Sequence, residues 1–182
     1  MSLSSFILKK AGWKIEQNIS IPEKCVICIA PHTSNWDFII GKLVYNSLKR
    51  QSAFLIKKEW LVFPFSLILK PMGAIGVDRS KKSSVTDQVA EKITNGEISQ
   101  IAITPEGTRK RNAEWKKGFY YIAMGAGIPI LLAGIDYSTK TITIGKEIRP
   151  TGDIDKDMRE IKLYYKDFKG KIPEYFSIGE VE

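Results

Sequence analysis

Short apolar runs with the composition of β-strands alternate with helical patterns along this chain, and this alternation restricts its fold more than any other feature. The runs are rich in β-branched and aliphatic residues, as buried strands are. The predicted strands are Cys25–Ala30, Ala53–Ile56, Ile101–Thr104, Ile130–Ala133 and Thr141–Ile144. Strands that alternate with helices build α/β folds. We therefore expect an α/β protein with a mainly parallel, mixed central sheet flanked by helices.

Helical patterns fill the segments between these strands. Apolar residues recur at helical spacing and predict helices over residues 36–47, 85–93, 115–125 and 155–168. Ser84 and Asp87 have the spacing of a capping box, and Gly96 is placed to end the helix that they begin. A chain of 182 residues suits one compact core, so residues 1–182 are expected to form a single domain.

His32 is the only histidine of the chain, and it directly follows the first predicted strand. Histidine is the side chain whose ordinary pKa allows proton exchange near neutrality. Asp37, five positions on, can hold one ring nitrogen and leave the other to accept a proton. Ligands of open α/β sheets bind at the carboxyl ends of strands. This position favours a catalytic base at His32 oriented by Asp37, while a structural His–Asp pair stays open as the alternative.

A second polar segment, residues 104–111 (TPEGTRKR), follows another predicted strand and is expected at the same edge of the sheet. Gly107 lets the backbone approach a ligand closely, and Arg109 can bind a phosphate with two hydrogen bonds. A solvated basic turn is the alternative. The position of Glu106 inside the basic cluster, directly after a strand, favours a binding site.

The two cysteines, Cys25 and Cys28, form a C-x-x-C pattern inside the first predicted strand. Residues three apart in a strand point to opposite faces. A zinc site would need two further ligands from a chain with one histidine. The pattern therefore predicts core cysteines, and no metal site is expected.

A formal net charge of +8 favours an anionic partner, which includes nucleic acid, a membrane surface and a phosphorylated substrate. The first apolar patch stops at Lys9 and Lys10, unlike a secretory signal. A spanning helix needs about 20 apolar residues, whereas the longest apolar run, 60–69, contains Pro64. We expect a cytoplasmic protein that is at most peripherally bound to the membrane.

Two segments have the composition of an interfacial contact. Residues 1–20 form a candidate interfacial helical segment, because apolar Phe6, Ile7 and Leu8 stand beside lysines. The aromatic-rich run 60–69 is the second candidate, for a lipid contact or an acyl groove. Core packing is the alternative for both segments.

Taken together, four sequence blocks resemble the 1-acylglycerol-3-phosphate acyltransferase family, the glycerolipid acyltransferases with a His-x4-Asp motif. The blocks are residues 32–37 (HTSNWD), 73–79 (GAIGVDR), 105–109 (PEGTR) and 128–130 (IPI). The resemblance covers about residues 25–135, the motif-bearing core. Pro31 stands where the family commonly has asparagine, Trp36 is bulkier than the usual residue, and Leu132 replaces a second proline.

The resemblance implies a glycerolipid-acyltransferase-like fold and transfer of a fatty acyl group from a thioester, acyl-CoA or acyl-carrier protein, to a lysophospholipid hydroxyl. An acceptor such as 1-acylglycerol-3-phosphate would place the reaction in phospholipid biosynthesis. His32 would be the general base and Asp37 its orienting group. The resemblance implies no metal and no resident cofactor. Partners would be the thioester donor, the lysophospholipid acceptor and an anionic membrane surface, with the protein at the inner face of the cytoplasmic membrane.

The acceptor's phosphate and headgroup would be held by residues of two blocks, Arg79, Glu106, Gly107, Thr108 and Arg109. Lys57, which follows the second predicted strand, is a further candidate for a phosphate contact. For Lys57, a solvated lysine is an equal alternative.

Two other functions remain open. A related acyltransferase could use an aminolipid or another hydroxylated lipid, and its activity would then ignore an acceptor phosphate. A non-enzymatic module could bind nucleic acid, which requires exposed aromatic residues among basic ones. Here Phe63 and Phe65 lie in an apolar run instead, so no nucleic-acid partner is expected.

Overall fold

The computed structural model describes residues 2–77 and 84–181, apart from the side chains of Lys57 and Trp60. The helices are α1 (Leu3–Lys10), α2 (Asn35–Ser47), α3 (Ser66–Leu69), α4 (Val85–Thr94), α5 (Gly118–Ala126) and α6 (Ile154–Tyr164), with short 3-10 turns at Lys58–Trp60 and Pro173–Tyr175. The strands are β1 (Lys14–Gln17), β2 (Cys25–Ala30), β3 (Ala53–Lys57), β4 (Ala74–Val77), β5 (Gln100–Ile103), β6 (Ile130–Asp136) and β7 (Thr141–Ile148).

The strands of the described residues belong to one 7-stranded sheet in the order β1-β7-β6-β2-β5-β3-β4. Neighbouring strands are parallel except β6 and β7, which are antiparallel. The predicted α/β fold with a mainly parallel, mixed sheet is therefore confirmed. The five predicted strands are all present, whereas the short edge strands β1 and β4 were missed because β1 carries three polar residues and β4 contains a glycine.

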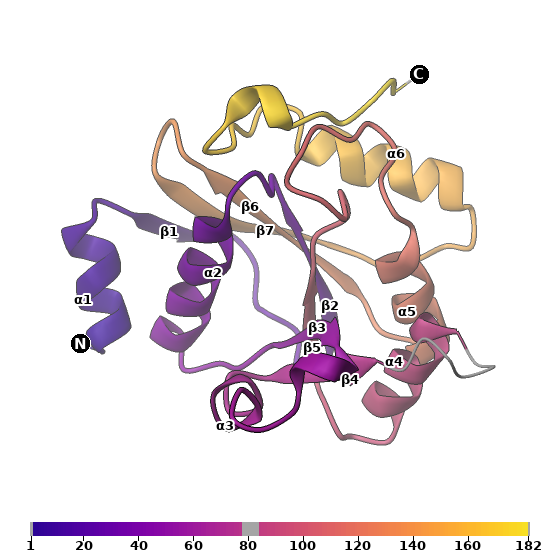
Figure 1. Ribbon diagram of the computed structural model, residues 1–182. Coiled ribbons are helices and arrows are strands. Elements are labelled where there is room, and N and C mark those ends of the chain that lie inside the picture. The colour runs from indigo at the N-terminus through magenta and orange to yellow at the C-terminus, as the bar shows by residue number, and fades with distance from the viewer. Residues whose placement is uncertain (1, 78–83, 182) are drawn as a thin grey trace.

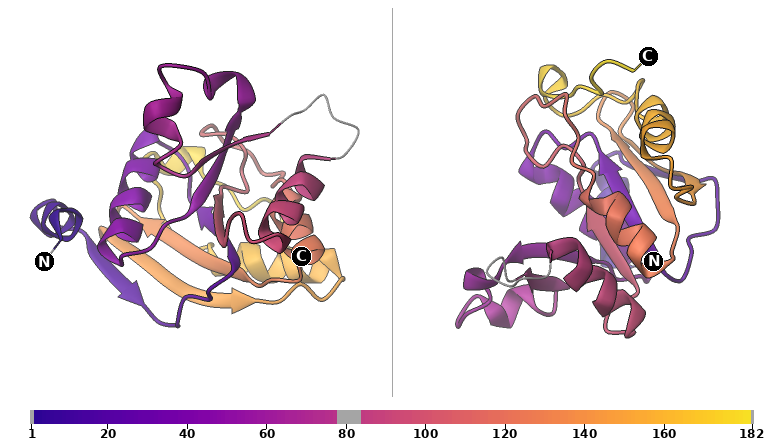
Figure 2. Two further views of the ribbon diagram at one scale, coloured as in Figure 1. Left: turned by 90° about the horizontal axis from the view of Figure 1, so that it is seen from below. Right: turned by 90° about the vertical axis from the view of Figure 1, so that its right-hand side faces the viewer.

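Helices cover both faces of the sheet. In Figures 1 and 2, α1 and α2 lie on one face, and α4, α5 and α6 lie on the other. Because β2 lies between β6 and β5, its side chains are buried on both faces, which explains its continuous apolar sequence. No described helix has the length and apolar content needed to cross a membrane.

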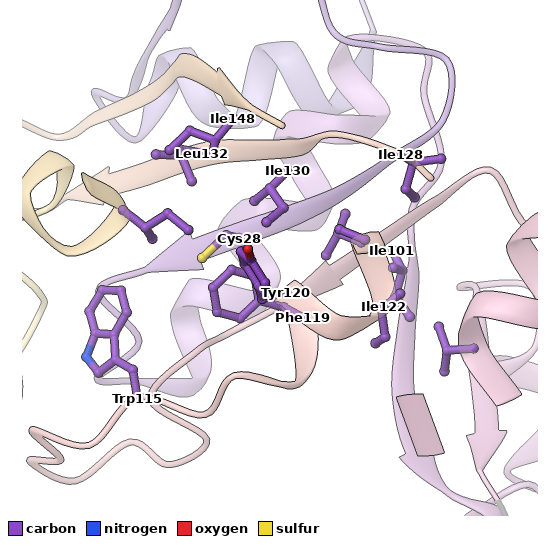
Figure 3. Packing of buried hydrophobic residues seen from close by; sticks show 14 of the residues in the cluster. Cys28, Ile101, Trp115, Phe119, Tyr120, Ile122, Ile128, Ile130, Leu132 and Ile148 are labelled. Carbon is purple, nitrogen blue, oxygen red and sulfur yellow. The ribbon is translucent and has the colours of Figure 1, made fainter. Parts of the chain in front are cut away.

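The larger part of the core lies beneath α5, where Phe119 and Tyr120 pack with Ile130 and Cys28 (Figure 3). Cys25 packs in a different cluster, against α2. Both cysteines are buried and unpaired, and burial raises the pKa of the Cys25 thiol to about 12. The prediction of core cysteines on opposite faces is confirmed.

Part of the first twenty residues packs into the fold. Leu8 on α1 is only 3% exposed and packs with Ile40 and Val44 of α2. After α1 the chain turns at Trp13 and forms β1, which pairs in parallel with β7. The N-terminal segment therefore builds one edge of the domain, although part of α1 remains exposed.

The predicted helices are present with shifted ends. Ser84 and Asp87 form the predicted capping box of α4. The helix predicted from Trp115 begins only at Gly118, because the Trp115 side chain enters the core and its indole N–H donates to the Ser177 carbonyl at 2.9 Å. The last predicted helix stops at Tyr164 rather than Phe168.

Candidate active site

His32 and Asp37 meet where β2 passes into α2. The turn that follows β2 carries His32, and Asp37 lies in the first turn of α2. Asp37 Oδ2 is 3.1 Å from His32 Nδ1. A carboxylate can only accept, so Nδ1 carries the proton in this contact, and Nε2 is left as the proton acceptor. The pair thus has the geometry of a general base held in one tautomer.

Asp37 is held in place by its own helix. Its Oδ2 accepts hydrogen bonds of 2.8 Å from the backbone N–H groups of Thr33 and Ser34. With Ser34 as N-cap, these contacts complete a capping box. The carboxylate that orients His32 is therefore also the group that begins α2, and it is only 3% exposed.

Glu106 lies against the backbone of His32 rather than on the wall of a pocket. Its Oε1 accepts a 2.8 Å hydrogen bond from the His32 N–H. Its side chain is 2% exposed, and Oε2 has no hydrogen-bond partner among the described residues. Burial raises the pKa of this carboxyl to about 7. Where the resemblance implied a headgroup contact, the geometry gives Glu106 a contact that holds the His32 loop.

The next three residues of the same loop do reach the open space beside His32. Gly107, Thr108 and Arg109 line one pocket together with His32 and Asn35. Gly107 has φ +66, and a Cβ there would lie 3.1 Å from Lys116 Cγ, so the turn requires glycine. The Arg109 guanidinium donates to the Asn35 side-chain carbonyl at the start of α2. A cationic group thus stands at the N-terminus of a helix, where anions are favoured.

The other two predicted contacts are placed only in part. Lys57 is the last residue of β3, which runs parallel to β5, so its backbone lies at the same edge of the sheet. Its side chain is outside the described part of the structure. Arg79 lies in 78–83, outside the described residues.

A pocket of about 950 Å³ extends from His32 between α2 and the sheet. Apart from the polar groups near His32, its walls are mostly apolar side chains of α2 and of strands β2, β3, β5, β6 and β7. These residues are Ile29, Phe38, Val44, Phe54, Leu55, Ile56, Ala102, Ile103, Ala133, Ile135, Ile142 and Ile144. Trp36 does not contribute to this wall: it is exposed, and the Lys171 ammonium lies 5.1 Å from its ring centroid. The pocket suits a ligand with a polar end and a long apolar part.

Sequence reasoning missed two residues of this region. Lys42 lines the pocket, and its ammonium donates at 2.7 Å to the carbonyls of Ser52 and Met72. Tyr137 donates its hydroxyl to Asp37 Oδ1 at 2.6 Å. Tyr137 directly follows β6, so the rule that located His32 after β2 would have located it too.

We expect Glu106→Gln to change stability in a pH-dependent way. Because the pKa of Glu106 is higher in the folded protein than in the unfolded chain, its contribution to the stability of the folded protein is fully present below about pH 4.5, where the carboxyl is protonated in both states. This contribution to the free energy of unfolding is lost as the pH rises through about 7 and the buried carboxyl ionises. The introduced glutamine cannot ionise, so the variant should gain on the wild type between about pH 5 and 8, by roughly 3 kcal/mol at most. Denaturant unfolding at both ends of this range measures the gain, with the exposed Glu114→Gln as control. A difference that is constant with pH would contradict a protonated buried carboxyl.

Comparison with known proteins agrees with this geometry. The family model described as Acyltransferase matches residues 13–135, which include the His32–Asp37 pair and the Glu106–Arg109 loop. No curated protein matches the chain in sequence. The match spans more than half of the chain and confirms the resemblance to glycerolipid acyltransferases. The chain therefore belongs to the Acyltransferase family and is an acyltransferase.

Proposed function

We propose that this acyltransferase moves a fatty acyl group from acyl-CoA or acyl-carrier protein to a hydroxyl of a lysophospholipid such as 1-acylglycerol-3-phosphate, in phospholipid biosynthesis. The observation that carries the proposal is the His32–Asp37 pair, which stands where a long apolar pocket meets Arg109. One end of this region suits an acyl chain and the other an anionic headgroup. The reacting hydroxyl and thioester would meet between them, beside the imidazole.

In this reaction His32 Nε2 takes the proton of the acceptor hydroxyl as its oxygen attacks the thioester carbonyl carbon. The C–S bond of the resulting tetrahedral intermediate then breaks, and the thiolate leaves with the proton returned by His32. Asp37 keeps the ring in the required tautomer and stabilises the transient imidazolium. General-base catalysis of this kind contributes about 10²- to 10⁴-fold. Neither a metal nor a resident cofactor is needed for these steps.

The apolar part of the pocket would receive the acyl chain. Its walls come from α2 and from five strands of the sheet, so the chain would lie between two layers of the domain. Each buried methylene contributes about 0.8 kcal/mol, which favours long acyl groups over acetyl groups. Lys42 would not attract an anion strongly, because two backbone carbonyls already hold its ammonium.

Arg109, Thr108 and the N-terminus of α2 would bind the acceptor phosphate. Guanidinium groups bind phosphate oxygens through paired charge-assisted hydrogen bonds. Lys57 and Arg79 are proposed to add to this site. Glu106 is proposed to act on the headgroup site only indirectly, by holding the backbone of His32.

The catalytic assignment predicts that His32→Ala abolishes transfer and that Asp37→Asn lowers kcat by roughly 10²- to 10⁴-fold with a smaller effect on KM. The reason is that His32 is the only imidazole of the chain. Steady-state assays with a panel of lysolipids and both donor types measure this. Asp155→Asn serves as control, since that side chain is 89% exposed on α6. A folded His32→Ala protein with near-normal turnover would exclude the mechanism.

The headgroup assignment predicts that Arg109→Ala raises the KM of a phosphate-bearing acceptor about tenfold or more, since charge-assisted hydrogen bonds contribute about 1.5–3 kcal/mol. The donor KM should change little. Arg111→Ala is the matched control, because Arg111 is exposed in the same loop and is not part of the pocket wall. If only the donor KM rises, Arg109 serves the donor's phosphates. If acceptors without phosphate react equally well, the acceptor is another hydroxylated lipid or an aminolipid.

We also propose that the protein works in the cytoplasm, bound peripherally to the anionic inner face of the cytoplasmic membrane. Two exposed apolar groups support this, Leu3, Phe6 and Ile7 on α1 and Val62, Phe63, Phe65, Leu67 and Ile68 around α3. Both groups lie next to α2 (Figure 1). Helix α1 packs against α2, and the Lys42 ammonium of α2 donates a hydrogen bond to the carbonyl of Met72, which lies just past α3. Exposed Lys9, Lys10 and Lys70 stand beside them. Both segments would thus contact lipid on the side of the molecule that holds the pocket.

Binding to vesicles that contain anionic lipid should therefore weaken as salt rises, because exposed charges are screened within about 10 Å at 0.1 M salt. Phe6→Ser and Phe63→Ser should each reduce co-sedimentation further. Leu163→Ser is the matched control, since Leu163 is an exposed apolar residue of α6, on the other face of the sheet. Equal binding of all variants, independent of salt, would contradict this orientation.

A further inference from the structure

The two oxygens of the Asp37 carboxylate have different partners. Oδ2 receives the His32 ring N–H and the backbone N–H groups of Thr33 and Ser34, all from its own end of α2. Oδ1 receives the Tyr137 hydroxyl at 2.6 Å. The carboxylate is therefore fixed by local contacts on one side and by one distant side chain on the other.

Tyr137 is itself firmly mounted. It directly follows β6, and its backbone N–H donates to the Lys169 carbonyl at 2.9 Å. The Asp136 side chain accepts hydrogen bonds from Ser138 and orders the turn that follows. The ring of Trp13 meets the Tyr137 ring edge-on, with centroids 5.0 Å apart. The hydroxyl thus reaches Asp37 from a rigid position.

The Tyr137 hydroxyl can act on Asp37 only as a donor. Burial and the adjacent Asp37 carboxylate raise its pKa far above the ordinary value, so it stays protonated at any working pH. A donor to a carboxylate reduces the negative charge that the carboxylate presents elsewhere. It also prevents the carboxylate from rotating away from the imidazole. Residues that hydrogen-bond to the ligands of a metal ion fix the orientation of those ligands in the same way.

We infer that Tyr137 is a positioning residue of this enzyme: its hydroxyl fixes the Asp37 carboxylate in the orientation that holds the His32 imidazole, and Trp13 fixes Tyr137. The inference rests on the proposed role of His32 as general base. Tyr137 lies two residues beyond the segment 13–135 that matches the family model. The groups that set the behaviour of His32 would then come from α2, from the loop after β5 and from the turn after β6.

Tyr137→Phe tests the inference, because it removes the hydroxyl and keeps the ring against Trp13. Without that donor, Asp37 attracts the imidazolium more strongly and orients the ring less well. We expect kcat to fall about 10- to 100-fold, as a lost hydrogen bond to a charged group would predict. The KM values of donor and acceptor should stay within about twofold. Tyr121→Phe is the matched control, since Tyr121 is exposed on α5, on the other face of the sheet.

A second readout needs no substrate. Because His32 is the only histidine, NMR follows one imidazole through a pH titration. We expect its titration midpoint to move to higher pH in Tyr137→Phe and to stay unchanged in Tyr121→Phe. Among the described residues, the titratable groups that face His32 are Asp37 and the buried Glu106, and Arg109 lines the same pocket. All are intact in both variants, so their contributions cancel in the comparison.

A folded Tyr137→Phe protein with unchanged kcat and an unchanged imidazole titration would overturn the inference, even if its thermal stability fell. If Tyr137→Phe does not fold, Trp13→Phe replaces it. That change loosens the support of Tyr137, so both effects should appear in smaller measure, and their absence would again overturn the inference. The titration is independent of catalysis. If the wild-type protein does not transfer acyl groups to lysolipids, the proposed function is refuted. The NMR titration would still show whether Tyr137 influences the His32 imidazole.

Discussion

The Asp37 carboxylate is the group on which both the fold and the site depend. A carboxylate that is 3% exposed is stable only when its oxygens accept hydrogen bonds. Here those hydrogen bonds cap the start of α2, orient the His32 imidazole and include one from Tyr137 in the turn after β6. The same contacts that satisfy the buried charge therefore hold His32 at the mouth of the pocket. Stability of the helix start and geometry of the site cannot be separated at this residue.

The layered architecture accounts for the rest of the site. Because β2 and β5 are adjacent and parallel, the loops that follow them emerge side by side. One loop supplies His32 and the other supplies Glu106, Gly107, Thr108 and Arg109. The opposite face of β2 is packed against α5 through buried hydrophobic side chains such as Phe119, which hold the strand in place (Figure 3). The pocket occupies the α2 side of the sheet.

Much of the fold could be predicted from the sequence, because long apolar strands and capped helices carry local signals. The run Cys25–Ala30 and the Ser84–Asp87 capping box are examples. Strands β1 and β4 could not be predicted, since four-residue edge strands form through pairing with neighbours rather than through their own composition. The contact between His32 and Asp37 could be predicted because the two residues are only five positions apart in the sequence. The burial of Glu106 depends on tertiary packing, which no local pattern encodes. The position of Tyr137 directly after β6 places it at the same edge of the sheet, but its hydrogen bond to Asp37 is also a product of tertiary packing.

The contact between Tyr137 and Asp37 also sets an order in which the site can form. The two residues are 100 positions apart, and Glu106 is 74 positions from His32. During synthesis His32 and Asp37 leave the ribosome early, long before the chain that completes their surroundings. Contacts of such long range form late, since the loop between them must close first. An emerging chain therefore carries His32 and Asp37 without a finished site until β6 joins the sheet beside β2.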